Sequence, residues 1–260
     1  MRVAVGQMTV DKDASVNTES VRDLAHRAAE GGARLLVLPE GIIARDPEDN
    51  AYAATHAEPV DGPFATALAT ASRDAGIAIA CSIHVTVEGH VENVFVLHDR
   101  GQLLASYTKL HPYDAFSGQE SASVTPGTEL PPVVELDGLR LAPLICYDIR
   151  FPDLAVALAL AGAEVLLCPA AWVKGPLKEH HWTTLVTARA LDATAYVVGC
   201  GEISARNVGR SLVVDPLGVT IAAAAEEPCL FFADLDPARV SHARQVLPVL
   251  ANRRLARPTL

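Results

Sequence analysis

The sequence predicts a layered α/β fold, and three observations support this prediction. Apolar runs of strand length alternate with segments that have the apolar spacing of helices, which is typical of an α/β arrangement. Turn signals of the hairpin type interrupt this alternation, so some neighbouring strands must be antiparallel. No low-complexity linker divides the chain, and we therefore expect one domain over residues 1–260.

The first half of the chain shows the alternation most clearly. The predicted strands are 3–8, 34–39, 77–84, 91–98 and 103–108, and the predicted helices are 15–31 and 62–75. Glu88, Gly89 and His90 separate two of these strands and favour a tight hairpin between them. Residues 110–131 follow with little periodicity, and a loop of this length is usually functional or disordered.

The second half of the chain repeats this theme. The predicted strands are 133–136, 139–146, 164–168, 196–199, 211–215, 219–223 and 229–234, and the predicted helices are 153–161, 177–193 and 236–244. Asp137 and Gly138 form the strongest short hairpin signal in the chain. Turn residues separate the last three strands from one another, so we expect them to form a closing meander.

The composition argues against several classes of function. Half of the residues are apolar, yet no stretch reaches the roughly 18 uninterrupted apolar residues that a membrane helix requires. The formal net charge is −10 and the only basic block lies at residues 253–257, which argues against nucleic acids and anionic membranes as partners. The first residues lack the apolar core and cleavage site of a signal peptide, so we expect a cytoplasmic protein.

The cysteines follow no structural pattern. They are Cys81, Cys146, Cys168, Cys200 and Cys229. Their odd number and wide scatter argue against a disulfide framework, and no Cys or His spacing matches a zinc site. His180 and His181 are adjacent, but nothing completes a metal site around them, and we expect both near the start of a helix.

Cys146 stands where an apolar run ends and a polar turn begins, shortly before Pro152 opens a predicted helix. The positive end of a helix favours thiolate over thiol, so this position suits a reactive cysteine. Free cysteines are also among the most buried residues. On this segment alone, an inert core cysteine is slightly the better interpretation.

Glu40 and Lys109 are the residues that favour a reactive cysteine. Each follows a predicted strand, as Cys146 does, and ligands of α/β proteins gather at the carboxyl ends of strands. Glu40 lies on a constrained turn between Pro39 and Gly41. Lys109 is one of four lysines against seventeen arginines, so it is less readily explained as a surface residue. Either side chain alone could still be an ordinary exposed one.

Three ordered segments resemble the catalytic segments of the nitrilase (carbon–nitrogen hydrolase) superfamily. They are Pro39-Glu40, Tyr107-Thr108-Lys109-Leu110-His111 and Ile145-Cys146-Tyr147-Asp148-Ile149-Arg150-Phe151-Pro152. Matching flanks extend the resemblance over essentially the whole chain, at Val5-Gly6-Gln7, Asn17, Asn93, Pro169-Ala170-Ala171-Trp172, Ala188-Arg189-Ala190 and Val213-Val214-Asp215-Pro216-Leu217-Gly218. The resemblance implies a four-layer α-β-β-α sandwich, with two mixed sheets covered by helices, that forms a homodimer.

The resemblance also implies a Glu-Lys-Cys triad. Cys146 would be the nucleophile and Glu40 the general base, while Lys109 would stabilise the tetrahedral intermediate together with the backbone N–H of Tyr147. A second glutamate of the family lies in the loop after the lysine, and Glu120 matches its setting. This chemistry uses no metal and no organic cofactor, and its partner is a small-molecule amide.

The segment around Cys146 is most similar to the branch that contains ω-amidases and deaminated glutathione amidases. Arg150 could hold a substrate carboxylate with its planar fork of donors, or it could pair with Asp148 or Asp153 in a structural role. Trp172 could form a wall of the substrate pocket or pack beneath it.

We therefore expect an amidase that releases ammonia from a small, carboxylate-bearing amide through a cysteine thioester. A nitrilase or an N-carbamoyl-amine hydrolase is the alternative within the same fold. A non-catalytic metabolite-binding scaffold is the alternative from another class, and intact Glu40, Lys109 and Cys146 argue against it. Residues 173–182 and 207–211 depart from the usual pattern of the branch, so the exact substrate stays open.

Overall fold

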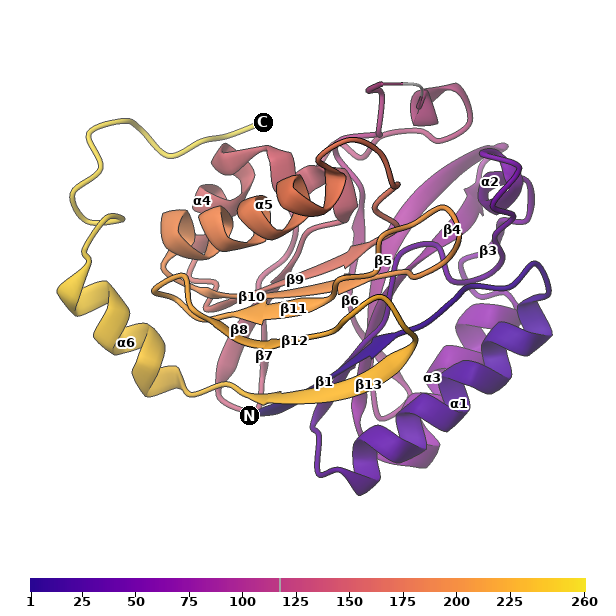
Figure 1. Cartoon of the computed structure of the whole chain (residues 1–260), viewed down its shortest axis with the longest axis horizontal. Coiled ribbons are helices and arrows are strands. Elements are labelled where there is room, and N and C mark those ends of the chain that lie inside the picture. The colour runs from indigo at the N-terminus through magenta and orange to yellow at the C-terminus, as the bar shows by residue number, and fades with distance from the viewer. Residues whose placement is uncertain (117) are drawn as a thin grey trace.

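Two mixed β-sheets pack face to face in the computed structural model, which describes residues 1–116 and 118–260 (Figure 1). The first sheet has the strand order β13 (Cys229–Asp234), β1 (Arg2–Gln7), β2 (Leu35–Val37), β4 (Ala78–Val87), β5 (His90–Asp99) and β6 (Gln102–Thr108), and β3 (Glu58–Pro59) pairs with β4. The second has the order β12 (Thr220–Ala223), β11 (Leu212–Val214), β10 (Tyr196–Gly201), β9 (Val165–Ala170), β8 (Leu139–Pro143) and β7 (Val134–Leu136).

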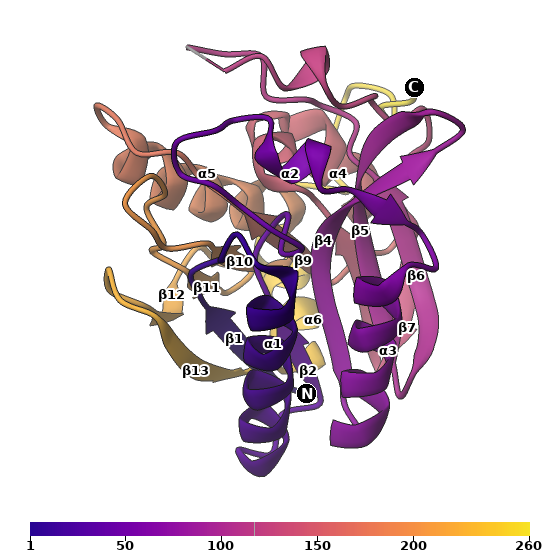
Figure 2. The same ribbon diagram turned by 90° about the vertical axis from the view of Figure 1, so that its right-hand side faces the viewer.

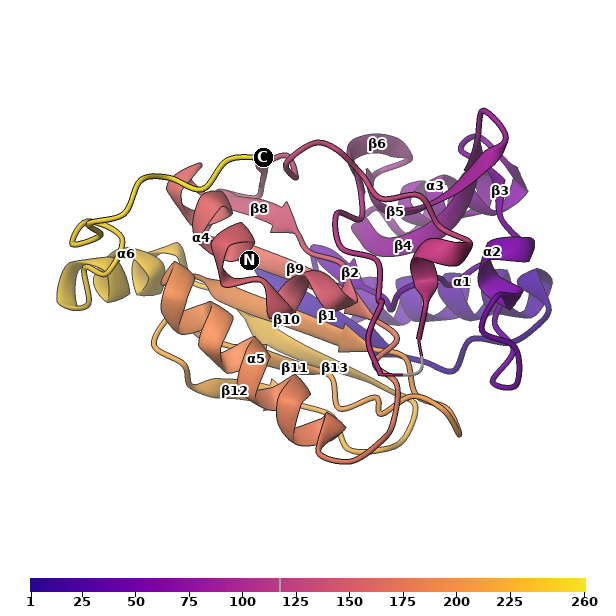
Figure 3. The same cartoon turned by 90° about the horizontal axis from the view of Figure 1, so that it is seen from above.

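Helices cover the outer face of each sheet. Helices α1 (Ala14–Glu30) and α3 (Pro63–Ala75) lie side by side on the first sheet, as Figure 2 shows. Helices α4 (Pro152–Leu160) and α5 (Lys178–Ala193) lie on the second sheet (Figure 3). The predicted four-layer α-β-β-α sandwich is therefore confirmed. Two further helices, α2 (Tyr52–Thr55) and α6 (Pro237–Val246), lie outside these layers.

Local signals in the sequence explain where the longer helices begin and end. Asp13 caps α1 by accepting a hydrogen bond from the backbone N–H of Ser15 at 2.8 Å. Helix α3 has Pro63 in its first turn and ends at Gly76, whose φ of 70° is the left-handed conformation that glycine adopts readily. Asp236 caps α6 in the same way as Asp13 caps α1.

Strand side chains of the first sheet alternate between two apolar cores. Val3 and Val5 face the core shared with the second sheet, whereas Ala4 between them faces the core under α1 and α3. Leu36 and Ile79 join Ala4 in that outer core. Because successive side chains of a strand point to opposite faces, strands buried on both faces are apolar throughout, as the sequence shows.

The predicted closing meander is wrong at its last strand. β11 and β12 form a hairpin in the second sheet, but β13 crosses to the first sheet and pairs antiparallel with β1, with Arg2 opposite Asp234. β13 thereby covers the edge of β1, whose backbone N–H and C=O groups would otherwise lack partners. A local turn signal cannot report this pairing between the two ends of the chain.

The other predicted helices and strands are found within a few residues of their predicted ends. The sequence patterns missed α2, β3 and a single turn of 3-10 helix at Glu120–Ala122. That turn lies in the loop predicted at 110–131, of which Ser117 is outside the described residues. None of the helices described is long and apolar enough to cross a membrane.

Gln7 lies at the end of β1, and its side chain links the first sheet by hydrogen bonds to loop residues next to the strands of the second sheet. Its side-chain oxygen accepts hydrogen bonds from the backbone N–H and the hydroxyl of Ser211, at 2.9 and 2.8 Å. Its side-chain nitrogen donates to the carbonyls of Ala225 and Glu227, each at 2.7 Å. Gln7 is 1% exposed, so water cannot replace these partners.

We expect Gln7→Leu to lower the free energy of unfolding by about 1–3 kcal/mol, because the buried N–H of Ser211 loses its acceptor. Urea denaturation measures this change. Gln102→Leu is the matched control at an exposed position, and a surface substitution of this kind changes stability by less than about 0.5 kcal/mol. Equal stability of the two variants would contradict the role assigned to Gln7.

Candidate active site

Glu40, Lys109, Glu120 and Cys146 line one cavity of about 390 Å³. They come from distant parts of the chain, and three of them follow strands: β2, β6 and β8. Strands β8, β9 and β10 are parallel, so their carboxyl ends meet at the same edge of the second sheet. The structure thus brings together the four residues that the sequence singled out as catalytic.

Glu40 is a buried carboxylate, and both of its oxygens accept hydrogen bonds. One oxygen accepts hydrogen bonds from Lys109 Nζ and Asn93 Nδ2, each at 2.8 Å, and the other accepts from the backbone N–H of Ala171 at 2.8 Å. Burial raises the pKa of Glu40, but the charges of Lys109 and Arg45 outweigh it and hold the pKa at about 2. Glu40 is therefore ionised at neutral pH.

The turn that carries Glu40 is fixed by its neighbours. Gly41 has a φ of 64°, a conformation that few other residues adopt without strain. Arg45 donates from Nε and Nη2 to the carbonyl of Glu40, at 3.3 and 3.1 Å. The constrained turn predicted from Pro39-Glu40-Gly41 is confirmed.

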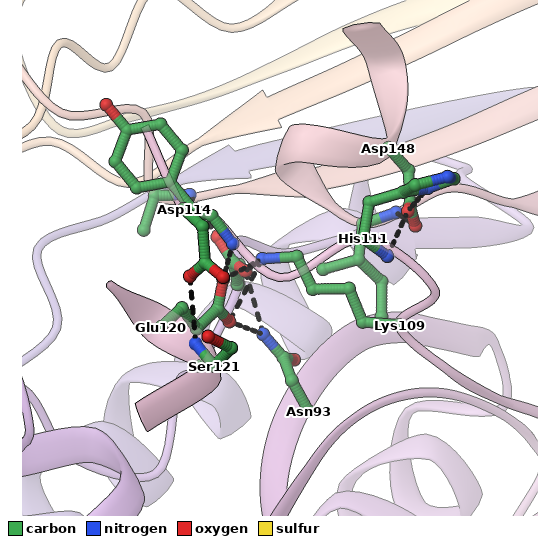
Figure 4. A network of polar contacts seen from close by, with 12 residues as sticks. Asn93, Lys109, His111, Asp114, Glu120, Ser121 and Asp148 are labelled. Atoms are coloured by element: carbon green, nitrogen blue, oxygen red, sulfur yellow. Dashed lines mark hydrogen bonds and ion pairs between the residues drawn. The ribbon is translucent and has the colours of Figure 1, made fainter. Parts of the chain in front are cut away.

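Lys109 is an ammonium group held between two carboxylates. It is 2% exposed, and Nζ lies 2.8 Å from Glu40 Oε1 and 2.8 Å from Glu120 Oε2. Figure 4 shows Lys109 reaching the Glu120 carboxylate beside the amide of Asn93. Burial lowers the pKa of Lys109, and the charges of Glu120 and Glu40 overcome this and raise it well above its usual value. Lys109 therefore stays charged and cannot act as a base.

Glu120 is held in place by groups from its own loop and from β5. Besides Lys109, its carboxylate accepts a hydrogen bond from the backbone N–H of Tyr113 at 2.6 Å and one from Asn93 Nδ2 at 3.3 Å. Asn93 bonds to Glu40 as well, so one amide bridges both acids. The long loop at 110–131 thus supplies one side of the site.

Cys146 is the first residue of a 3-10 helix, Cys146–Arg150, and not the last residue of a strand. The strand predicted at 139–146 ends at Pro143, because the backbone turns away from the sheet to begin this helix. Cys146 has a φ of 45°, which is unusual and strained for a residue with a side chain.

Asp148 holds the strained turn. Its carboxylate is fully buried and accepts hydrogen bonds from the backbone N–H of Ile145 at 2.9 Å, the hydroxyl of Tyr107 at 2.9 Å and Nδ1 of His111 at 2.7 Å. Figure 4 shows His111 pointing to Asp148. The segment that contains Lys109 and the turn at Cys146 are therefore linked through one carboxylate.

The start of a helix favours the thiolate form, but other influences on the Cys146 thiol are stronger in the unliganded site. Burial raises the pKa of the Cys146 thiol, and the negative charge of Glu40 raises it further, well above the usual value. Lys109 and a hydrogen bond from the Ala171 N–H act in the opposite direction but are weaker. A short 3-10 turn does not compensate for this burial, so the resting group is a protonated thiol beside an ionised carboxylate.

The three residues predicted to bind substrate have different positions. Trp172 lines the cavity, and its indole N–H also donates to the carbonyl of Lys178 at 2.9 Å, so it both forms a wall and packs. Tyr147 and Arg150 are not among the residues that line the cavity. Arg150 forms no ion pair with Asp148 or Asp153 among the described residues, so that structural alternative is wrong.

His84 and Lys178 are two of the cavity residues that the sequence analysis missed. His84 lies in β4, and burial together with the charge of Arg45 lowers its pKa to about 4, so it is neutral. Lys178 is the first residue of α5 and is 5% exposed. The scarcity of lysines that drew attention to Lys109 applies equally to Lys178, whereas no signal in the sequence distinguishes His84.

Comparison with known proteins places this arrangement in a family. The family model described as carbon-nitrogen hydrolase matches residues 2–245. The chain belongs to the carbon-nitrogen hydrolase family. Its cavity thus holds the residues that resembled the catalytic segments of that family.

Individual members of this family are similar over nearly the whole chain. The deaminated glutathione amidase of Escherichia coli O157:H7 is 46% identical over 261 residues, which covers 100% of both chains. The human deaminated glutathione amidase is 34% identical, over 97% of this chain and 82% of that protein.

A solved structure of an amidase has the same fold. It is a glutamate-to-glutamine mutant of the amidase from Nesterenkonia sp. AN1, in which acrylamide has added to the active-site cysteine. The two structures superpose with a TM-score of 0.84 and 29% identity, over 98% of this chain and 96% of that one.

The residues described contain no group of three or more His, Cys, Asp or Glu side chains arranged to hold a metal ion. His180 and His181 lie in the first turns of α5, as predicted.

We expect Lys109→Met to destabilise the fold at neutral pH by about 3–5 kcal/mol, since it leaves buried carboxylates without their counter-ion. Without Lys109, burial raises the folded-state pKa of Glu40 above its unfolded value. The loss is then full at neutral pH and shrinks as the pH falls and the carboxyls take up protons. Urea denaturation at neutral and mildly acidic pH measures both effects.

Lys12→Met is the control for removal of a lysine from an exposed ion pair, the one with Asp46, and we expect it to change stability little. A Lys109→Met protein as stable as the wild type at neutral pH would contradict the assigned balance of charges.

Proposed function

We propose that this carbon-nitrogen hydrolase is an amidase that cleaves a small, carboxylate-bearing primary amide and releases ammonia. The observation that carries the proposal is the meeting of Glu40, Lys109, Glu120 and Cys146 in one cavity. The names of the similar proteins from Escherichia coli and from human, both deaminated glutathione amidases, support an amide substrate.

In the first step, the sulfur of Cys146 attacks the amide carbonyl carbon while Glu40 takes the thiol proton. The thiol has a raised pKa and Glu40 is ionised, so proton transfer accompanies the attack and no stable thiolate precedes it. A C–S bond forms, and the electron pair of the carbonyl moves to its oxygen.

Lys109 and the backbone N–H of Tyr147 stabilise the resulting oxyanion in this proposal. Lys109 suits the role because it is charged, buried and fixed by two carboxylates before the substrate arrives. Loss of one such donor typically costs about 3–4 kcal/mol of transition-state stabilisation. Glu120 acts through Lys109 and Tyr113, as a positioning residue.

Collapse of the tetrahedral intermediate breaks the C–N bond, and Glu40 returns the proton to the leaving nitrogen, so ammonia departs. The acyl group remains on Cys146 as a thioester. Water then attacks the thioester carbon, Glu40 accepts a proton from that water, and the proton returns to the sulfur as the C–S bond breaks. The products are the carboxylic acid and the original enzyme.

We also propose that the chain forms a homodimer, as the family resemblance implies, and that it acts in the cytoplasm. Size-exclusion chromatography with light scattering tests the dimer directly.

The alternatives differ in their products, which makes the proposal testable with one panel of substrates. A nitrilase would release ammonia from nitriles, and an N-carbamoyl-amine hydrolase would release carbon dioxide together with ammonia. A non-catalytic scaffold would release neither. Ammonia from primary amides, without carbon dioxide and without turnover of nitriles, is the result expected here.

We expect Cys146→Ala to reduce ammonia release by about 10⁴-fold or more, because Cys146 is the one cysteine among the described residues that line the cavity. Cys229→Ala is the matched control, since Cys229 is a partly buried cysteine on β13 outside the cavity. A coupled assay for ammonia measures both. Full activity of Cys146→Ala would refute the proposed mechanism.

A further inference from the structure

His111 connects the segment that carries Lys109 to the turn that carries Cys146. It follows Lys109 by two residues, and its backbone N–H donates to Asp148 Oδ1 at 3.1 Å. Nδ1 of its imidazole ring lies 2.7 Å from the same oxygen (Figure 4). A carboxylate oxygen only accepts hydrogen bonds, so Nδ1 carries the hydrogen in this contact. The mechanism proposed above gives this histidine no part in the reaction.

The buried carboxylate of Asp148 depends on His111 for one of its two oxygens. Oδ2 accepts hydrogen bonds from the backbone N–H of Ile145 and from the hydroxyl of Tyr107, each at 2.9 Å. Among the described residues, Oδ1 accepts from His111 alone, and no lysine or arginine pairs with Asp148. The last torsion of an aspartate side chain has only a broad preference, so partners at both oxygens are needed to fix its orientation. Loss of the imidazole would therefore loosen the acceptor that holds Ile145.

The ring of His111 also packs on the residue that ends the same turn. Its centroid lies 3.6 Å from that of Phe151, with 9° between the two ring planes. Phe151 follows the 3-10 helix Cys146–Arg150, and its backbone N–H donates to the carbonyl of Asp148 at 3.0 Å. The ring of Tyr147 stands edge-on to Phe151, with centroids 5.5 Å apart. One imidazole thus contacts both Asp148, which anchors the start of the turn, and Phe151, which ends it.

The turn between these two anchors carries groups whose positions the proposed mechanism requires. Cys146 has a φ of 45°, a conformation that only the surrounding structure can hold in place. In the proposed mechanism, the sulfur of Cys146 attacks the carbonyl carbon and the N–H of Tyr147 donates to the oxyanion. Both groups follow the path of the backbone, and a displacement of about 1 Å in an active site can cost about a hundredfold in rate.

His111 itself does not line the catalytic cavity, unlike Glu40, Lys109 and Cys146. Its backbone N–H and its Nδ1 are both engaged with Asp148, and its ring covers Phe151. A substrate that occupies the cavity therefore does not touch this histidine. Any effect of His111 on the reaction must pass through Asp148 and Phe151.

We propose that His111 is a positioning residue for the amidase reaction, which holds the turn at Cys146 in place relative to Lys109 through its contacts with Asp148 and Phe151. The inference rests on the proposed amidase function and adds to it the residue that connects the nucleophile to the lysine. Because these contacts do not reach the substrate, their loss should weaken stabilisation of the transition state more than binding of the substrate.

Two variants separate the hydrogen bond of His111 from its ring. His111→Phe keeps a flat ring against Phe151 but cannot donate to Asp148, whereas the side-chain amide of His111→Asn can donate in place of Nδ1. For the primary amide that the wild type hydrolyses best, we expect His111→Phe to lower kcat by about tenfold to hundredfold and to change KM by less than about twofold. His111→Asn should recover most of the lost kcat.

Hydrogen exchange of the backbone, followed by mass spectrometry, tests the same contacts without any substrate. In His111→Phe, the peptide that spans residues 144–151 should exchange faster than in the wild type, since the N–H of Ile145 loses its fixed acceptor, whereas peptides from α1 should be unchanged. His90→Phe is the matched control, because His90 also pairs with a carboxylate, that of Glu92 at 2.9 Å, but lies where the β4–β5 hairpin turns. We expect wild-type kcat and wild-type exchange in that variant.

An unchanged kcat, or unchanged exchange of residues 144–151, in folded His111→Phe overturns the inference. A His111→Asn protein no more active than His111→Phe also overturns it, because the hydrogen bond would then have no part in the effect. If His111→Phe does not fold, Phe151→Leu, which removes the stacked ring, replaces it, with the same expected direction of kcat and exchange and the same contradicting result.

Failure of the proposed function gives a different result. If the wild-type protein releases ammonia from no amide, the amidase proposal fails, and with it any role of His111 in that reaction, whatever the exchange shows. If the wild type hydrolyses amides through Cys146 while folded His111→Phe keeps full kcat, the amidase proposal stands and the role of His111 is refuted.

Discussion

A single buried ammonium group organises the catalytic half of this protein. Lys109 is nearly inaccessible to water, and such a charge is tolerated only when anions compensate it. Glu40 from the turn after β2 and Glu120 from the long loop supply these anions. The requirement to neutralise one lysine therefore fixes the positions of three chain segments, and Asn93 secures both acids from β5.

The same charges determine, before any substrate binds, that Glu40 is ionised and Cys146 is protonated. Lys109 and Arg45 lower the pKa of Glu40, whereas burial and Glu40 raise the pKa of Cys146. The pair is thus an ionised carboxylate beside a protonated thiol, as the proposed mechanism requires, and that mechanism assigns the positive charge of Lys109 to the oxyanion. Asp148 stabilises the turn, since its hydrogen bond to the backbone N–H of Ile145 holds Cys146 in a left-handed conformation that would otherwise be unfavourable.

The sequence predicts those features that depend on residues close together in the chain, and it does not predict contacts between distant segments. The alternation of apolar segments and the hairpin at Asp137-Gly138 are local, and both were predicted correctly. The pairing of β13 with β1 joins the two ends of the chain, and no local pattern encodes it. Glu40, Lys109 and Cys146 were found because each follows a strand, but Glu120 came only from resemblance to a family. Arg150 is not among the residues that line the cavity, and the direction of a long side chain cannot be predicted from its position in a motif.

The central claim is that Cys146 carries the acyl group during turnover. The most direct measurement is mass spectrometry of the protein quenched during hydrolysis of a primary amide, followed by identification of the modified peptide. The account predicts that the peptide containing Cys146 gains the acyl group without its nitrogen, and that added hydroxylamine releases the group as the hydroxamate. Ammonia release with no adduct, or an adduct on another residue such as Cys168, would contradict it.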